Sequence, residues 1–311
     1  MSLINLLQIQ QMRATAQQAE VFGLKWQARF ILSASRYPAA YQALCAPSPD
    51  SALARLASER PRIANFLVAP YLDARWDVEE RVRRLSAHAE AMTGALAKYG
   101  FSIADELHLL DLTGFGMEGY SLVLDKPQWF LREGLLTINL FQADLRLFSV
   151  SFAFDRRGGG LDLLIGSVQG RKIDGILDVY RDFTKMSHGV RPRDFMIEAL
   201  RMLARAEGVT RILAIPDQFR HQRHPYFSRE TGRELPLNYD EIWLDRGGIL
   251  GGHGYFELPL SVQREFDTIP ARKRSLYRKR FDLLERLETA LVEQLAQVEP
   301  RRVQSHDSGQ D

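Results

Sequence analysis

The spacing of apolar residues predicts that the first hundred residues are helical. From Asp77 onward, apolar positions recur every three or four residues, which places them on one stripe of a helix. The stripe consists of Val78, Val82, Leu85, Ala89, Met92 and Leu96. Asp77 with Glu80 three residues later resembles a capping box, and Gly100 is a plausible stop. Shorter helices are predicted over residues 50–58 and 62–67.

From about residue 106 the pattern changes to short β-rich runs separated by Gly, Asp and Pro. Strands are predicted over residues 107–113, 120–124, 134–141, 147–154 and 161–168. In the fourth run, Phe148, Val150 and Phe152 alternate with Ser149 and Ser151, so one face is bulky and the other small. The glycine-rich turn over residues 155–160 then reverses the chain. These runs predict an antiparallel meander.

After Gly170 the period changes again. Helices are predicted over 173–186 and 192–206, a buried strand over 211–215, a hairpin from 239–244 and 255–258, and a last helix that Pro300 stops. A strand, crossover helices and a second strand form a parallel β-α-β unit, which makes the sheet mixed.

The predicted fold class is therefore α+β: a helical N-terminal region, a mixed and mainly antiparallel sheet with crossover helices, and a long C-terminal helix. We expect the helical region over residues 1–105, the α+β domain over 106–300 and a disordered tail over 301–311. The polar stretch 217–238 is long for a plain connection, and loops of that length are often functional.

Composition excludes some classes and leaves the partner open. The chain has 311 residues, 45% of them apolar and 26% charged, which excludes a disordered or fibrous protein. Its 41 Lys and Arg against 39 Asp and Glu mean that any basic surface must come from local clustering. The single Cys45 excludes an internal disulfide or multi-cysteine zinc site and fits a reducing compartment. No apolar run has the ~20 residues of a spanning helix, and the start lacks signal-peptide features. We expect a cytoplasmic protein, with contact to the inner face of the membrane as an open alternative.

The loop over residues 184–193 is a candidate anion site. Pro192 suits the first turn of the following helix, whose free N–H groups attract phosphate, and Arg191, Arg193 and Lys185 add positive charge. The equal alternative is a polar loop flanked by arginines. Gln169 and Gly170 end the strand before the crossover, where ligands bind in open α/β sheets, although a simple turn is the alternative.

Three histidines, His188, His221 and His224, are considered for proton transfer or metal binding. His221 and His224 have the H-x-x-H spacing of metal ligands, but no third ligand stands at a recognisable distance and the neighbouring arginines repel a cation, so no metal site is predicted. His221 or His188 suits a general base or acid because imidazole titrates near neutral pH. The alternative for His221 is a solvated basic loop.

The segment over residues 272–280, here called the basic segment, carries six Lys or Arg in nine positions. On a helix it could track the phosphates of an anionic lipid, a cofactor or a nucleic acid. The alternative is a solvated helix start, and one cluster in a nearly neutral chain does not predict a nucleic-acid protein.

Several blocks together resemble the VirK/YbjX family. The blocks are residues 132–134, 165–170, 185–192, 239–243 with 247–248, 254–259 and 272–284, and their order is the specific feature. The resemblance implies a Gram-negative bacterial protein of poorly defined biochemistry, associated with virulence and with resistance to cationic antimicrobial peptides through the cell envelope. The sequence departs at Ile215-Pro216-Asp217, where a Ser-containing polar strand end is expected.

The order of elements is also similar to the acetyltransferase (GNAT) superfamily. That similarity implies an acyl carrier, usually coenzyme A, whose pyrophosphate would lie at Gly170 and at the helix start Arg191-Pro192. About 20 residues separate these two places, and the glycine-containing pyrophosphate loop of the superfamily is absent.

Two functions therefore stay open. In the first, an acyl group passes from acyl-CoA or an acyl carrier protein thioester to an envelope precursor. Gln169, Gly170, Lys185, Arg191 and Arg193 would hold the carrier, His188, His221 and Asp240 would be catalytic, and Tyr239 and Trp243 would bind substrate. In the second, a non-catalytic factor engages an anionic lipid, a nucleic acid or a protein partner through the basic segment. We expect Lys185, His188, Arg191, Tyr239, Asp240 and Trp243 to line one cleft, unless Tyr239 and Trp243 are core residues.

Overall fold

The computed structural model describes residues 6–94, 96–157, 159–227, 235, 237–262, 266 and 269–303. The chain divides into two units. Unit 1 comprises Met1–Ile103, Phe154–Arg156 and Asp217–Asn238, and unit 2 comprises Ala104–Ala153, Arg157–Pro216 and Tyr239–Asp311. The polar stretch 217–238 belongs to the same unit as the N-terminal helices.

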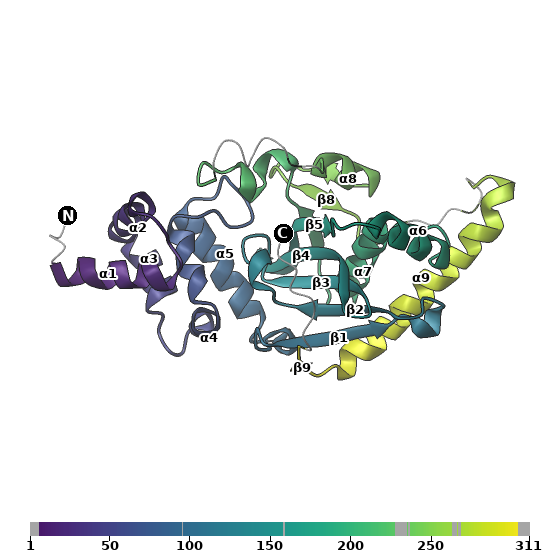
Figure 1. Cartoon of the computed structure of the whole chain (residues 1–311), viewed down its shortest axis with the longest axis horizontal. Coiled ribbons are helices and arrows are strands. Elements are labelled where there is room, and N and C mark those ends of the chain that lie inside the picture. Colours follow the sequence, from purple (N-terminus) through teal and green to yellow (C-terminus); the bar gives the residue numbers. More distant parts are fainter. Residues whose placement is uncertain are drawn as a thin grey trace. The chain divides into compact units, whose positions relative to one another are not determined.

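Unit 1 is built from helices (Figure 1). They are α1 (Leu6–Gln18), α2 (Leu24–Arg36), α3 (Pro38–Cys45), α4 (Ala52–Glu59), α5 (Val78–Ala91) and the 3-10 turns η1 (Pro61–Leu67), η2 (Ala97–Tyr99), η5 (Asp217–Phe219) and η6 (His221–Arg223). The Asp77 carboxylate accepts the backbone N–H of Glu80 at 2.8 Å, which confirms the predicted cap. The helix predicted from Asp77, with Leu96 as its last apolar position, ends at Ala91, where Thr93 and Gly94, both weak helix formers, follow.

Unit 2 holds one mixed sheet in the order β7-β8-β6-β5-β4-β3-β2-β1-β9. The strands are β1 (Asp105–Asp111), β2 (Tyr120–Asp125), β3 (Leu136–Gln142), β4 (Leu145–Arg157), β5 (Gly160–Gly170), β6 (Arg211–Ala214), β7 (Ile249–Leu250), β8 (Phe256–Leu258) and β9 (Arg301–Arg302). From β1 to β4 neighbouring strands are antiparallel, whereas β5 and β6 are parallel. The α+β class with a mixed, mainly antiparallel sheet is therefore confirmed.

Four helices complete unit 2. They are α6 (Ile176–Met186), α7 (Pro192–Ala206), α8 (Tyr239–Asp245) and α9 (Ala271–Gln297), with the turns η3 (Thr113–Phe115) and η4 (Gln128–Phe130) between early strands. Helices α6 and α7 make the crossover from β5 to β6. Helix α7 packs against β3, β5 and α9, and its predicted core positions are all buried: Phe195, Ala199, Met202 and Leu203.

Two predictions near the C-terminus are wrong. Residues 239–244 form helix α8 rather than a strand, because Tyr239, Ile242 and Trp243 are buried at the three- and four-residue spacing of a helix face. The hairpin partner of β8 is instead the short β7. Arg301 and Arg302, expected in a disordered tail, form β9 and pair with Glu106 and Asp105 of β1. Residues 304–311, the rest of that predicted tail, lie outside the described residues.

Candidate functional site

Unit 2 contains a cavity of about 1010 Å³ bordered by α7, α9, the loop after α6 and the loop before α9. Its apolar wall comes mainly from α9 and the two loops. The described lining residues are Gly189, Val190, Asp194, Glu198, Arg205, Arg246, Ser261, Val262, Ile269, Tyr277, Arg280, Phe281, Leu284, Glu285 and Glu288. A volume of this size accommodates a small organic ligand.

The loop after α6 is shaped around Arg280 of α9. His188 and Gly189 both have positive φ, 54° and 84°. The Arg280 Nε donates a hydrogen bond to the His188 carbonyl oxygen at 3.1 Å. A Cβ on Gly189 would lie 2.7 Å from an Arg280 Nη, so a larger residue would displace the guanidinium, and the positive φ itself favours glycine. Two sequence blocks more than eighty residues apart therefore meet at one rim of the cavity.

Most carboxylates in the cavity wall are already paired with arginines. Arg205 binds Glu288 at 2.6 Å, and Glu198 binds the buried Arg201 at 2.5 Å. Asp194 lies 3.1 Å from Arg193 and 3.7 Å from Arg246. Among the described residues, no carboxylate is ion-paired with Arg280, and Glu285 is the lining carboxylate without an ion-pair partner. The cavity therefore offers Arg280 as its available cation.

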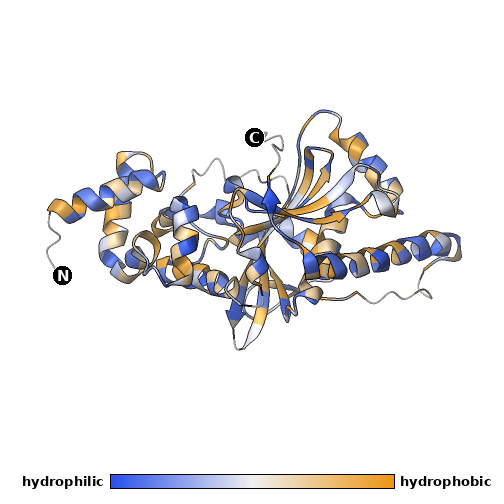
Figure 2. Ribbon diagram, turned by 90° about the horizontal axis from the view of Figure 1, so that it is seen from below, coloured by the Kyte–Doolittle hydropathy of each residue, from blue (hydrophilic) through white to orange (hydrophobic). Residues whose placement is uncertain are grey.

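The basic segment forms the first turns of α9, and five of its six cations are exposed: Arg272, Lys273, Arg274, Arg278 and Lys279. The sixth, Arg280, is half-buried, with its guanidinium 4.3 Å from the centre of the Tyr277 ring. Because successive helix positions are about 100° apart, the cations point in all directions around the axis. Within α9, Asp282 is the first acidic residue, and the end of the helix that precedes it is hydrophilic in Figure 2.

His188 lies next in sequence to the cavity wall. Burial lowers the pKa of its imidazole, and the neighbouring charges of Lys279 and Arg280 lower it further. At neutral pH the ring is therefore unprotonated and able to accept a proton.

The predicted anion-binding residues surround a helix start that already has a carboxylate. Lys185 is exposed and ion-paired with Asp182 at 2.9 Å. Arg191 is the exposed N-cap of α7, and Arg193 reaches Asp194 and, at 3.6 Å, Asp245 of α8. Since Asp194 sits in the first turn of α7, it supplies the negative charge that the helix dipole favours there.

The strand end at residues 169–170 is held by packing and one charged hydrogen bond. Gln169 donates from Nε2 to the Glu133 carboxylate at 2.6 Å, which joins two of the sequence blocks. Gly170 is exposed, and a Cβ there would lie 2.6 Å from the Phe148 ring and 2.8 Å from the Tyr180 hydroxyl. The glycine therefore permits a close side-chain contact in this structure.

Tyr239 and Trp243 are fully buried. Strand β6 ends at Ala214, opposite Ile165, whereas β5 continues to Gly170. Helix α8 covers the edge of β5 that β6 leaves unpaired. The Tyr239 hydroxyl accepts the Val168 N–H at 3.1 Å and lies 3.4 Å from its carbonyl oxygen, and the Trp243 Nε1 donates to Ile215 at 2.8 Å. This is the packing alternative of the sequence analysis. Asp240 lies beside Tyr239 in the first turn of α8.

His221 and His224 belong to unit 1, whereas His188 and Asp240 belong to unit 2. His221 is buried with its ring 5.6 Å from that of Phe227. Burial, and then the charge of Arg81, lower the pKa of His224 to about 4. In the described part of the chain, no group of three or more His, Cys, Asp or Glu residues is placed to hold a metal ion.

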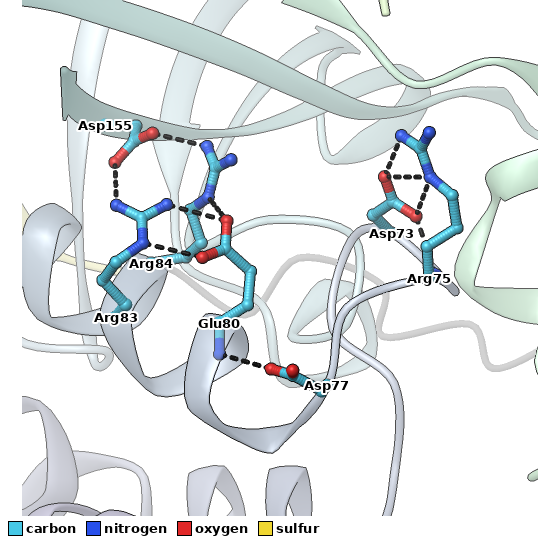
Figure 3. A network of polar contacts seen from close by, with 7 residues as sticks. All are labelled: Asp73, Arg75, Asp77, Glu80, Arg83, Arg84 and Asp155. Carbon is cyan, nitrogen blue, oxygen red and sulfur yellow. Dashed lines mark hydrogen bonds and ion pairs between the residues drawn. The ribbon is translucent and has the colours of Figure 1, made fainter. Parts of the chain in front are cut away.

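The sequence gives little signal for a buried ionic network in unit 1 (Figure 3). Arg84 of α5 is 4% exposed and pairs with Asp155, which is 3% exposed and 71 positions later. Glu80 accepts from Arg83 and from Arg84, each at 2.7 Å. Asp73 holds Arg75, whose guanidinium lies 3.6 Å from the Phe219 ring centre. The only local clue is the helical spacing of Glu80, Arg83 and Arg84.

A second missed cluster lies within the sheet of unit 2. Asn139 donates to Asp125 at 2.8 Å and accepts from Ser149 at 2.7 Å, and Arg146 binds the other Asp125 oxygen at 2.6 Å. Thr137 pairs across the strands with Ser151 at 2.8 Å. The alternation of small polar residues in the fourth predicted strand signals this face, but not that it is buried.

No helix among the described residues is long and apolar enough to cross a membrane. No solved structure matches the chain.

Known relatives cover much of the chain. A Haemophilus influenzae protein named "Uncharacterized protein" is 30% identical over 229 residues, 72% of this chain and 74% of its own length. A second protein of that organism, with the same name, is 35% identical over 133 residues, 43% of this chain and 44% of its own length. The Escherichia coli "Uncharacterized protein YbjX" is 25% identical over 242 residues, 76% of this chain and 73% of its own length. The last match confirms the resemblance to the VirK/YbjX family.

One family model matches residues 19–293, which include the cavity and the basic segment. The chain belongs to the family described as "Protein of unknown function (DUF535)".

Proposed function

We propose that unit 2 binds an anionic amphiphile. Its apolar chain would lie in the cavity beside α9, and its phosphate would lie at Arg280 and the basic segment. The observation that carries this proposal is that one helix, α9, supplies Phe281 and Leu284 of the apolar wall and the run of cations directly before them.

The apolar part of the proposal rests on a set of side chains that meet in the cavity wall. They are Val190, Val262, Ile269, Phe281 and Leu284. Burying an alkyl chain against them contributes roughly 0.8 kcal/mol per CH₂ group. Val262 is 51% exposed in the structure, so the wall has apolar surface that a ligand can cover.

The charged part rests on Arg280. Its Nε is used by the His188 carbonyl, which orients the guanidinium, and among the described residues it has no carboxylate partner. A phosphate suits such a planar donor, and the neighbouring cations of the basic segment add a field that attracts anions.

Two sources fit this chemistry: a phosphopantetheine thioester such as acyl-CoA, and an anionic phospholipid. Either would connect the site with the cell envelope through lipid or precursor chemistry. We propose that the protein acts at the cytoplasmic side of that envelope.

The test compares ligands that carry both an alkyl chain and a phosphate with net negative charge with ligands that lack the chain, the phosphate or the net charge. Palmitoyl-CoA and a lyso-phosphatidylglycerol, below their aggregation concentrations, should raise the melting temperature of the full chain. Coenzyme A alone, palmitate alone and lyso-phosphatidylcholine should raise it less. If only one of the two expected ligands raises the melting temperature, that ligand identifies the source. Equal shifts of the melting temperature with all five ligands overturn the proposal.

A matched pair of variants locates the binding. Val262→Glu places a charge in the cavity wall and should weaken binding at least about tenfold, because it buries a carboxylate against the acyl chain. Val292→Glu is the control, since Val292 lies on α9 at 48% exposure but does not line the cavity. Equal affinity of the two variants contradicts this location.

Acyl transfer is a second candidate, favoured by the lowered pKa of His188 beside the cavity. His188 would accept the proton of an amine or hydroxyl while that amine or hydroxyl attacks the thioester. The position expected for the carrier has less support, because Tyr239 uses the Val168 backbone groups and Asp194 occupies the start of α7. Release of free thiol from palmitoyl-CoA that is lost in His188→Asn, with ligand affinity unchanged, would support transfer.

A further inference from the structure

Helix α2 of unit 1 exposes an ordered set of side chains. Its outward positions are Leu24, Lys25, Ala28, Arg29, Leu32 and Arg36, here called the α2 face. The apolar members are spaced by four residues, so they form one stripe along the helix. Leu24 is 78% exposed and Leu32 is 68% exposed, and the adjoining Phe22 is 72% exposed.

The cations of the α2 face lie beside the apolar stripe. Lys25 and Arg29 each follow an apolar member by one position, which turns them by about 100° around the axis. The Arg29 guanidinium lies 4.7 Å from the centre of the Trp26 ring, and the Lys25 ammonium lies 5.6 Å from it. Over residues 6–36 there are four cations and a single acid, Glu20.

The opposite side of α2 is already used. Phe30 and Ala34 are buried in unit 1, and the Trp26 ring contacts Tyr226 with centroids 4.5 Å apart. The α2 face is therefore not needed for the core of unit 1. Apolar residues also stand at the start of α1, where Leu6 and Leu7 are 73% and 75% exposed.

We propose that the α2 face docks unit 1 onto the surface of an anionic phospholipid bilayer. An apolar stripe flanked by Lys and Arg is the pattern of helices that lie in the membrane interface, with apolar side chains in the acyl boundary and cations at phosphate level. The excess of positive charge selects an anionic surface over a neutral one. The α2 face belongs to unit 1 and the residues that line the cavity belong to unit 2, so the inference does not rest on the proposed function.

The experiment is sedimentation of the full chain with vesicles. Vesicles of phosphatidylcholine with about a third phosphatidylglycerol should bind the protein, and pure phosphatidylcholine should bind it at least about tenfold more weakly. The double variant Leu24→Glu with Leu32→Glu should lose binding to the mixed vesicles by at least about tenfold. The control is Leu177→Glu with Leu244→Glu, which changes two leucines of unit 2 that are 71% and 60% exposed and should bind like the unchanged chain.

A second pair of variants separates this surface from the basic segment. Lys25→Glu with Arg29→Glu should weaken vesicle binding and its dependence on salt, and should weaken them more than Arg278→Glu with Lys279→Glu, which changes the site proposed for unit 2. Loss confined to the α9 variant overturns the proposal and leaves the function proposed for unit 2 intact. Unchanged binding in both α2 variants overturns it as well. Light scattering tests whether a second copy of the chain occupies the α2 face instead. A dimer of the unchanged chain that dissociates in the leucine variant, with no vesicle binding, would show this pairing and overturn the proposal.

Discussion

The two units place their arginines in different environments. In unit 1, Arg84 is buried with carboxylates on both sides, Glu80 and Asp155. In unit 2, the basic segment of α9 leaves five of its six cations exposed, and no acidic residue occurs among them. A buried charge is tolerated only when it is paired. Exposed charges of the same sign repel one another, so a cluster of them does not stabilise the fold.

This difference separates structural from functional charge. The network around Arg84 ties α5 to Asp155 within unit 1, and removing a member should lower the free energy of unfolding. In the basic segment, Arg280 binds the His188 carbonyl and Arg274 binds the Ile269 carbonyl, but the exposed Arg278 and Lys279 form no ion pair among the described residues, so changing those two should affect binding while the fold persists. The following predictions test that distinction at decreasing size of effect.

The largest effect is expected for Arg84→Met. The change leaves Asp155 buried without its closest cation, and breaking a buried pair from one side typically destabilises by about 3–5 kcal/mol. Urea unfolding measures it. Arg278→Met in the basic segment should change the free energy of unfolding by less than about 0.5 kcal/mol. Similar values for the two variants would show that the environments do not differ in the way argued.

A smaller effect is expected for Gly189→Ala. Alanine at φ 84° costs about 1–2 kcal/mol, and its Cβ would also lie 2.7 Å from Arg280. Gly208→Ala is the control, because Gly208 has φ 67° but no atom within 4 Å of the added Cβ. Thermal unfolding gives the stability of both. Only Gly189→Ala should also weaken binding of palmitoyl-CoA or lyso-phosphatidylglycerol. Equal affinities of the two variants would show that the loop at Gly189 does not contribute to ligand binding.

What the sequence predicts well is local. Helix α7 begins at Pro192 as predicted, because a fixed φ at the first turn and an apolar stripe at helical spacing both act within a few residues. The Asp77 cap is confirmed for the same reason. The prediction of a strand at α8 is wrong because a seven-residue segment with Tyr239 and Trp243 fits either period, and only its burial against β5 decides.

The candidate site was predictable in part. The basic segment and the 184–193 loop are visible as clusters, but their meeting through Arg280 and the His188 carbonyl joins positions 92 apart. The same holds for Gln169 and Glu133, 36 apart, and for Arg84 and Asp155. Such pairs depend on the tertiary arrangement, and no spacing rule connects them.

The pH dependence of unit 1 should follow Glu80. Hydrogen bonds from Arg83, with a further contribution from Arg84, lower the pKa of Glu80 from 4.5 to about 2. Because the folded pKa lies below the unfolded one, the stabilisation is present above pH 4.5 and is lost as the pH falls toward 2. Unfolding of the wild type and Glu80→Gln should therefore differ at pH 6 and converge near pH 2. A difference that stays constant over this range contradicts the linkage.

The smallest effect is expected at the cavity, for Glu285→Gln. Glu285 lines the cavity five positions after Arg280 and has no ion-pair partner among the described residues, so it repels an anionic ligand at long range. Its side chain is exposed, and solvent limits such an interaction to a few tenths of a kcal/mol. The variant should bind palmitoyl-CoA or lyso-phosphatidylglycerol about twofold more tightly at low salt, and the gain should vanish at high salt. Glu293→Gln, on α9 but outside the cavity, is the control. Calorimetric titration at two salt concentrations decides, because weaker binding of Glu285→Gln would mean that this carboxylate does not repel the bound anion.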